Sequence, residues 1–174
     1  MPIPEACIDS RNVRYLLAVF WGTICAAAVS APILASHALS TAAGLVYLLF
    51  APICHQLPAR SFILVGHPLA VCHRCTGIYA GLFLSSFVHF DNYSPLGSQI
   101  SLRVFVLCGS APILLDAILP YTGIWINTPI SRTATGLIFG TMLSALLVPG
   151  ISELLHAAPW RRFPVASHIK GEIS

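Results

Sequence analysis

The sequence predicts an all-α integral membrane protein, a bundle of about five transmembrane helices with a loop rich in Cys and His at one membrane edge. Only 9% of the 174 residues are charged, against roughly 25% in a typical soluble domain, and 56% are hydrophobic. The mean hydropathy is +0.81, and apolar stretches alternate with short polar connections. Because a helix needs about 20 apolar residues to cross the hydrocarbon core, this alternation indicates several crossings, with four as the alternative to five.

The five expected helices belong to one transmembrane domain, residues 15–150. A polar N-terminal segment, 1–14, precedes it, and an interfacial or disordered tail, 151–174, follows it. The first two helices form a tight hairpin or, alternatively, one long helix bent at Pro32. Pro149 and Gly150 are expected to end the last helix, since proline removes a backbone donor. The expected helices are 15–35, 37–53, 76–90, 101–119 and 133–148.

The segment between the second and third helices contains an apolar run, SFILVGHPLAV, that is too short to span a membrane. Gly66 and Pro68 interrupt it. We expect it to lie in the interface or to re-enter the membrane, where non-helical backbone must be shielded by protein or water.

Small residues recur at four-residue spacing in two of the expected helices. Gly77 and Gly81 lie on one face of the third helix, and Gly136 and Gly140 lie on one face of the fifth. Such faces allow neighbouring helices to approach closely, so the pattern predicts tight helix packing.

The loop's cysteines and histidines form the candidate site. Cys72 and Cys75 make a C-x-x-C motif beside a helix start, whose partial positive charge lowers the pKa of a thiol. With Cys54 and His55 they form a Cys₃His set suited to zinc, for which His67 and His73 are alternative histidines. Iron or an iron–sulfur cluster is a further alternative, although clusters usually take four cysteines.

Counting five crossings places further polar residues on the same membrane side as the cysteines. Asp116 lies inside an apolar segment, where an unpaired carboxylate at the membrane centre costs about 2.5–3.5 kcal/mol, so we expect it to have a partner. Arg132 is the expected partner, and Arg60 or a metal ion are the rivals. The same count puts the N-terminal Cys7 and Arg14 on this side.

The orientation follows weakly from the basic residues. Five lie on the expected cysteine face and four on the other, but Arg11 and Arg14 precede the leading helix and favour a cytoplasmic site. The expected location is a prokaryotic inner membrane. A net charge of +3 is too small to indicate nucleic acid, so the expected partner is the lipid bilayer.

A series of motifs runs along the chain from the cysteine loop to the fifth expected helix. The motifs are Cys54-His55-Gln56, Arg60-Ser61-Phe62, Gly66, Cys72-x-x-Cys75-Thr76-Gly77-Ile78-Tyr79-x-Gly81, then Asp116, Arg132, Thr135, Gly136 and Gly140. These motifs resemble a family of small bacterial and archaeal membrane proteins, catalogued as a domain of unknown function, number two thousand and eighty-five. The resemblance covers roughly residues 48–149, with departures at His73 and Ala117. It implies a multi-spanning membrane protein and supplies no activity.

Three functions are consistent with these residues, and whether the protein is an enzyme stays open. The first is a membrane protein with a structural or catalytic metal site, zinc favoured. The second is a quinone-linked thiol–disulfide oxidoreductase, similar in plan to the vitamin K epoxide reductase and disulfide-forming protein B groups, with Cys54 and Cys7 as its further thiols. The third is a non-enzymatic transporter or assembly partner, for which a homo-oligomer would be needed.

Overall fold

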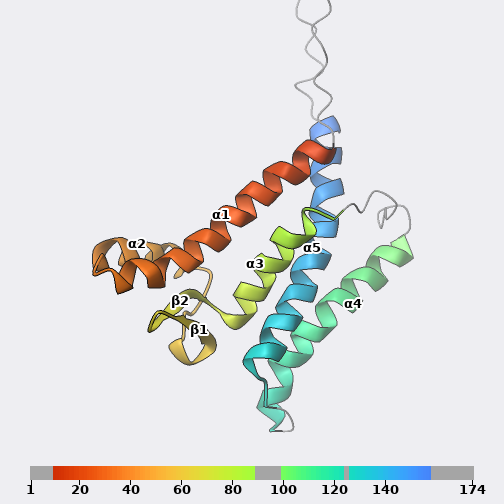
Figure 1. Cartoon of the computed structure of the whole chain (residues 1–174). Helices are drawn as coiled ribbons and strands as arrows, with labels where there is room; N and C mark the ends of the chain where they lie inside the picture. Colours follow the sequence, from red (N-terminus) through yellow and green to blue (C-terminus); the bar gives the residue numbers. More distant parts are fainter. Residues whose placement is uncertain (1–9, 89–98, 124–125, 158–174) are drawn as a thin grey trace, which may run out of the picture.

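The computed structural model describes residues 10–88, 99–123 and 126–157. These residues form a mostly helical protein with one small β-hairpin and two short 3₁₀ helices, η1 and η3 (Figure 1). The elements are α1 (Ser10–Ser36), α2 (Ser40–Phe50), η1 (Pro58–Arg60), β1 (Ser61–Leu64), β2 (His67–Cys72), α3 (His73–Ser85), α4 (Gln99–Ile118), η3 (Leu119–Thr122) and α5 (Pro129–Ala157).

Three of the described helices are long and apolar enough to cross a membrane. Their spanning portions are Arg11–Ser36, Val104–Thr122 and Pro129–Leu155. The 11 residues of α2 and the 13 of α3 rise only about 16 and 20 Å, short of a hydrocarbon core of about 30 Å. The helices expected at 37–53 and 76–90 are therefore shorter than predicted.

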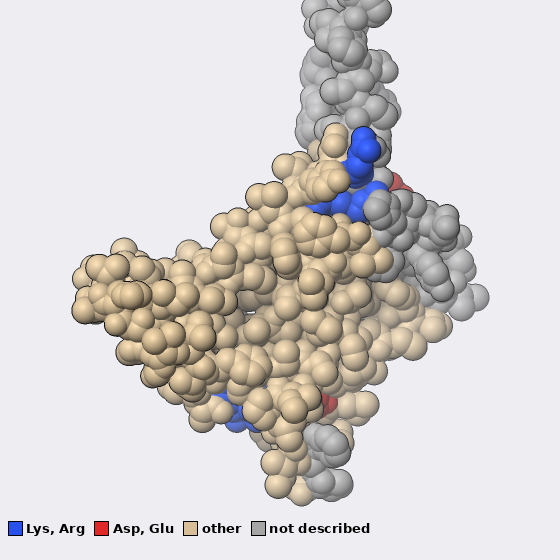
Figure 2. Space-filling view, viewed as in Figure 1, with Lys and Arg blue, Asp and Glu red and all other residues tan. Residues whose placement is uncertain are grey.

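The surface of the helices fits a lipid environment. Large apolar side chains point outward, such as Leu16 and Val19 on α1, Leu48 on α2 and Leu107 on α4. On the face shown in Figure 2, Lys, Arg, Asp and Glu gather toward the two ends, and the band between them has no charge. An exposed apolar surface of this extent is typical of a membrane-contacting protein.

The first helix and α2 form a hairpin, as the first of the two sequence interpretations predicts. A short connection after Ser36 separates them, and the two helices pack against each other. Pro32 lies within α1 rather than at the point where the chain reverses.

The apolar run after Cys54 forms a β-hairpin, which corrects the all-α prediction for this segment. Strands β1 and β2 pair antiparallel, with Ile63 opposite Pro68 and Leu64 opposite His67. The two-residue turn consists of Val65 and Gly66, which have φ angles of 51° and 79°. Two successive positive φ angles match the twist of flanking strands, and glycine is suited to the second of these positions.

The closest helix contact joins α3 and α5. A Cβ atom added to Gly77 would lie 2.2 Å from the Thr133 carbonyl oxygen, and one added to Gly140 would lie 2.2 Å from that of Ile78. Gly81 and Gly136 are equally restricted, by the carbonyl oxygens of Leu137 and Arg74 at 2.5 and 2.4 Å. Each helix thus presents glycines to the backbone of the other. Only glycine, which has no Cβ atom, permits the two backbones to lie this close together.

The fifth helix is longer than predicted. It continues through Pro149 to Ala157, although this proline was expected to end it. A proline inside a membrane helix is tolerated because its missing hydrogen bond can be compensated locally.

The helix directions correct the crossing count. Helix α1 begins at the end of the molecule where α5 ends, whereas α3 and α5 both begin at the opposite end, beside the β-hairpin (Figure 1). The reason is that α2 is too short to be a separate crossing. Arg14, in the second turn of α1, therefore lies away from the end that holds the hairpin, contrary to the prediction; Cys7 is outside the described residues.

The α3–α5 contact predicts a sharp difference between two Gly→Ala substitutions. Gly140→Ala should lower the free energy of unfolding by about 1–3 kcal/mol, because the added methyl forces the helices apart. Gly44→Ala, on α2, is the matched control: nothing lies within 4 Å of its added Cβ, so it should be neutral or stabilising by up to about 1 kcal/mol. Denaturant titration in mixed micelles, followed by circular dichroism, measures both; equal effects would contradict the close contact.

Candidate metal centre

Three cysteines meet where β2 passes into α3. Cys72 ends β2 and is the N-cap residue of α3, and Cys75 lies in the first turn of that helix. Cys54 follows α2, where its N–H group donates a hydrogen bond to the Phe50 carbonyl at 2.9 Å. The Sγ atoms of Cys54, Cys72 and Cys75 all lie within 4.8 Å of one another.

Hydrogen bonds fix the loop that carries Cys54 against its neighbours. The Cys72 N–H group donates to Cys54 Sγ at 3.2 Å. The Gln56 side-chain amide donates to the Tyr47 carbonyl at 2.7 Å and to the Ala70 carbonyl at 2.9 Å, and so joins α2 to β2. The Tyr47 hydroxyl adds a bond to the Pro68 carbonyl at 2.6 Å. These bonds hold the third cysteine close to the C-x-x-C motif.

One side of the cysteine cluster is apolar. Cys54 is only 5% exposed and belongs to a buried group that includes Ala31 of α1, Phe50 of α2 and Val71 of β2. Cys72, Cys75 and Tyr79 pack against this group and are partly buried. An apolar wall excludes water and raises the strength of electrostatic interactions at the sulfur atoms.

The surroundings favour a thiolate at Cys72. The Cys75 thiol donates a hydrogen bond to Cys72 and, with smaller help from Cys54 and from the backbone N–H groups of Cys75 and Arg74, lowers the pKa of the Cys72 thiol to about 5 despite partial burial. The direction agrees with the sequence prediction, but the neighbouring thiol contributes more than the helix start. Cys72 is therefore ionised at neutral pH, and a thiolate is the form that binds metal.

The histidines predicted as ligands lie outside the sulfur cluster. Among the described residues, no histidine nitrogen joins the group of three sulfur atoms. His55 is exposed and borders the adjoining pocket, whereas His67 lies on β2 opposite Leu64. Of the predicted Cys₃His set, the structure brings together the three cysteine sulfur atoms but not a histidine.

His73 is buried against an aromatic ring. Its imidazole meets the Phe62 ring edge-on at a centroid distance of 4.4 Å, and Nδ1 is buried without a hydrogen-bond partner in the described part of the chain. Burial, and then the positive charge of Arg132, lower the pKa of His73, so the ring is neutral.

Asp116 pairs with Arg74, which corrects the predicted pair with Arg132. Arg74 Nη2 and Nε donate to Asp116 Oδ2 at 2.8 and 3.1 Å, and Nη2 also donates to the Asp116 carbonyl at 2.9 Å. Because α3 begins at His73 rather than at Thr76, Arg74 is a helical residue that extends sideways to α4. The sequence did not single out Arg74, because it lies inside the C-x-x-C motif.

Two further residues that the sequence did not single out complete this network. Ser131 Oγ donates to Asp116 Oδ1 at 2.8 Å, and Asn127 Nδ2 donates to the Asp116 carbonyl at 2.9 Å. The Asn127 side-chain oxygen in turn accepts bonds from Nε, at 3.0 Å, and Nη2 of Arg132. Asp116 thus orients Arg132 through a neutral amide without cancelling its charge.

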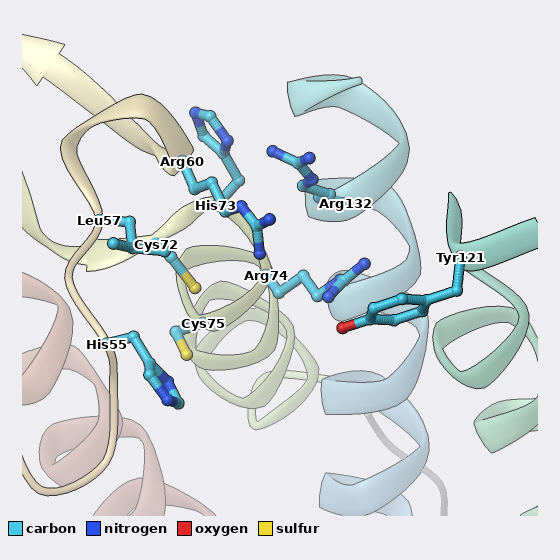
Figure 3. A pocket seen from close by; sticks show the side chains of 9 residues that line it. All are labelled: His55, Leu57, Arg60, Cys72, His73, Arg74, Cys75, Tyr121 and Arg132. Carbon is cyan, nitrogen blue, oxygen red and sulfur yellow. The ribbon is translucent and has the colours of Figure 1, made fainter. Parts of the chain in front are cut away.

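A pocket of about 340 Å³ opens beside the sulfur atoms (Figure 3). Cys72 and Cys75 form part of one wall, and Arg60, Arg74 and Arg132 form much of the remainder. His55, Leu57, His73 and Tyr121 complete the lining. The cysteine cluster therefore has one apolar, buried side and one side that faces an open, positively charged space.

Comparison with known proteins places this arrangement in a family. A family model described as a predicted membrane protein, DUF2085, matches residues 54–146. The chain belongs to the DUF2085 family. The match begins at Cys54 and contains the C-x-x-C motif, Asp116 and Arg132, so it includes the whole candidate site.

Similar proteins are found in archaea. An uncharacterized protein of Methanocaldococcus jannaschii is 28% identical over 116 residues, which is 64% of this chain and 71% of that protein. An uncharacterized protein of Methanothermobacter thermautotrophicus is 32% identical over 105 residues, 59% of this chain and 90% of that protein. No solved structure matches the chain.

Proposed function

We propose that this DUF2085 protein holds a metal ion, zinc by preference, on Cys54, Cys72 and Cys75 at one end of its helix bundle. The observation that carries the proposal is the convergence of three sulfur atoms within 4.8 Å. Three tetrahedral zinc–thiolate bonds of 2.3 Å place sulfur atoms about 3.8 Å apart, so small side-chain movements suffice. The site adjoins the buried apolar group on one side, which favours a stable, closed set of ligands there.

The fourth metal position would face the pocket. Cys72 and Cys75 line that space, and His55 borders it as an exposed side chain. His55, a water molecule or a pocket ligand could then complete the tetrahedron. A zinc site with three protein ligands and one open position is the arrangement typical of catalytic zinc, whereas four protein ligands make a structural site.

The convergence of three cysteines favours a metal site over a thiol–disulfide relay. A relay to a quinone needs a second thiol pair, for which Cys7 was the remaining candidate, and Cys7 lies outside the described residues. The Cys54 sulfur atom instead lies within 4.8 Å of both sulfur atoms of the C-x-x-C motif, as ligands of one shared ion would.

Metal analysis of the purified protein tests the site directly. We expect inductively coupled plasma mass spectrometry to find about one zinc ion per chain. The metal content should fall at least tenfold in Cys54→Ser, Cys72→Ser and Cys75→Ser, because each substitution removes a thiolate ligand. Cys108→Ser is the matched control, since Cys108 is an exposed cysteine on α4. Wild-type protein without stoichiometric metal, or serine variants with unchanged metal, would contradict the proposal, provided that circular dichroism shows intact helices.

We also propose that the cysteine end faces away from the cytoplasm. Arg11 and Arg14 stand at the start of α1, which is the opposite end, and Arg103 lies near the start of α4, toward the same end. Because Arg11 and Arg14 lie at the end opposite the cysteines, the basic residues near the leading helix now favour a cytoplasmic location for the N-terminal end. A bound metal would occupy the sulfur lone pairs. It would thereby protect the thiolates from oxidation outside the cytoplasm, where cytoplasmic reductants are absent.

Labelling of intact cells measures this orientation. Val65→Cys places a thiol at the tip of the β-hairpin, where the native residue is 62% exposed, and Arg11→Cys places one at the other end. A membrane-impermeant maleimide should add a label to Val65→Cys, beyond the wild-type background, in intact cells. It should reach Arg11→Cys only after the cells are permeabilised. The reverse pattern would show that the cysteine end faces the cytoplasm.

A further inference from the structure

The pocket beside the cysteines carries more positive than negative charge. Three arginines line it, and among the described residues the adjoining Asp116 forms its ion pair with Arg74. Arg132 is held by the uncharged side chain of Asn127. The Arg60 side chain is exposed, and its guanidinium group has no hydrogen bond or salt bridge to any described residue. Neither Arg60 nor Arg132 therefore has a carboxylate partner among the described residues, and the Cys72 thiolate is the negative group that lines the same pocket.

These two guanidinium groups face a common space. Figure 3 shows the Arg60 and Arg132 side chains extending toward each other from opposite walls of the pocket, near Cys72. Like charges that face each other repel. An anion placed between them would turn the repulsion into two attractive contacts, and arginine's planar fork suits the oxygen atoms of such a group.

We propose that the pocket binds a small phosphate-bearing molecule, whose phosphate oxygens are held by Arg60 and Arg132 beside the cysteine cluster. The two arginines come from separate elements, η1 and α5, and approach from different sides. A tetrahedral phosphate offers separate oxygen atoms in both directions, whereas a carboxylate has two oxygens in one plane. The pocket volume of about 340 Å³ equals that of roughly eleven water molecules, so a phosphate with a small organic group fits.

The charge balance holds with or without a bound metal. Three thiolates and a divalent ion carry one negative charge, which leaves one of the two arginine charges available. Without a metal, the Cys72 thiolate carries one negative charge, which again leaves one of the two arginine charges available. The inference therefore does not depend on the metal site proposed above, although a phosphate oxygen would lie near the open metal position.

Two sources of phosphate are tested separately. The soluble probe is sn-glycerol 3-phosphate, titrated calorimetrically into the full-length protein in an uncharged detergent. The lipid probe is phosphatidylglycerol, compared with zwitterionic phosphatidylcholine, and counted on the protein by native mass spectrometry. Binding of the soluble probe identifies a metabolite-type ligand, and retention of phosphatidylglycerol alone identifies a lipid headgroup.

The variants decide whether the pocket is responsible. Arg60→Gln and Arg132→Gln should each weaken binding of the effective probe at least tenfold, because each removes one charged contact to phosphate. Arg11→Gln, which makes the same charge change at the other end of the molecule, should stay within twofold of wild type. Binding of neither probe, or an equal loss in Arg11→Gln, would overturn the proposal.

The same samples separate this inference from the metal proposal. Elemental analysis of each variant reports its metal content. Titration of chelator-treated wild-type protein independently reports phosphate binding without the metal. Phosphate binding by metal-free protein would uphold the pocket even if no variant ever holds zinc. Stoichiometric zinc without phosphate binding would leave the metal site standing and overturn the pocket alone.

Discussion

The glycine contact between α3 and α5 sets the geometry on which the rest of the site depends. Gly136 of α5 lies against the Arg74 carbonyl, and Gly77 of α3 lies against the Thr133 carbonyl, so the two backbones meet within a turn of the cysteine motif. The first turn of α3 carries Cys75, and the first turn of α5 carries Arg132. Close packing therefore joins the C-x-x-C motif and Arg132 into one unit.

A buried ion pair attaches α4 to this unit. Asp116 is 6% exposed and receives hydrogen bonds from Arg74, Ser131 and Asn127, so its charge is fully partnered near the apolar interior. Loss of either partner would leave an uncompensated buried charge, which is far more costly than loss of a surface pair. The pair also holds Arg74 toward α4, which leaves Arg60 and Arg132 to determine the charge of the pocket.

The sequence predicts the parts of this structure that depend on composition and short spacing. Scarce charge and long apolar runs indicate the helical membrane class, and the C-x-x-C spacing with Cys54 indicates the cysteine cluster. The β-hairpin was missed because its strands lack the alternation of apolar and polar residues that marks a half-buried strand. The signal was present, since Val65 and Gly66 separate two short apolar runs as a two-residue turn does. The Arg74–Asp116 pair was missed because it depends on where α3 begins. The crossing count correctly placed Asp116 and Arg132 at the cysteine end. It failed for Arg14, because apolar content does not fix the length of α2.

X-ray absorption at the zinc edge tests the central claim, that three cysteines converge on a metal. The spectrum of the full-length protein should show three sulfur donors at about 2.3 Å and one nitrogen or oxygen donor at about 2.0–2.1 Å. Multiple scattering from an imidazole ring would identify His55 as the fourth ligand, and its absence would indicate a ligand from the pocket. A first shell of nitrogen and oxygen donors alone, or with a single sulfur, would contradict the account.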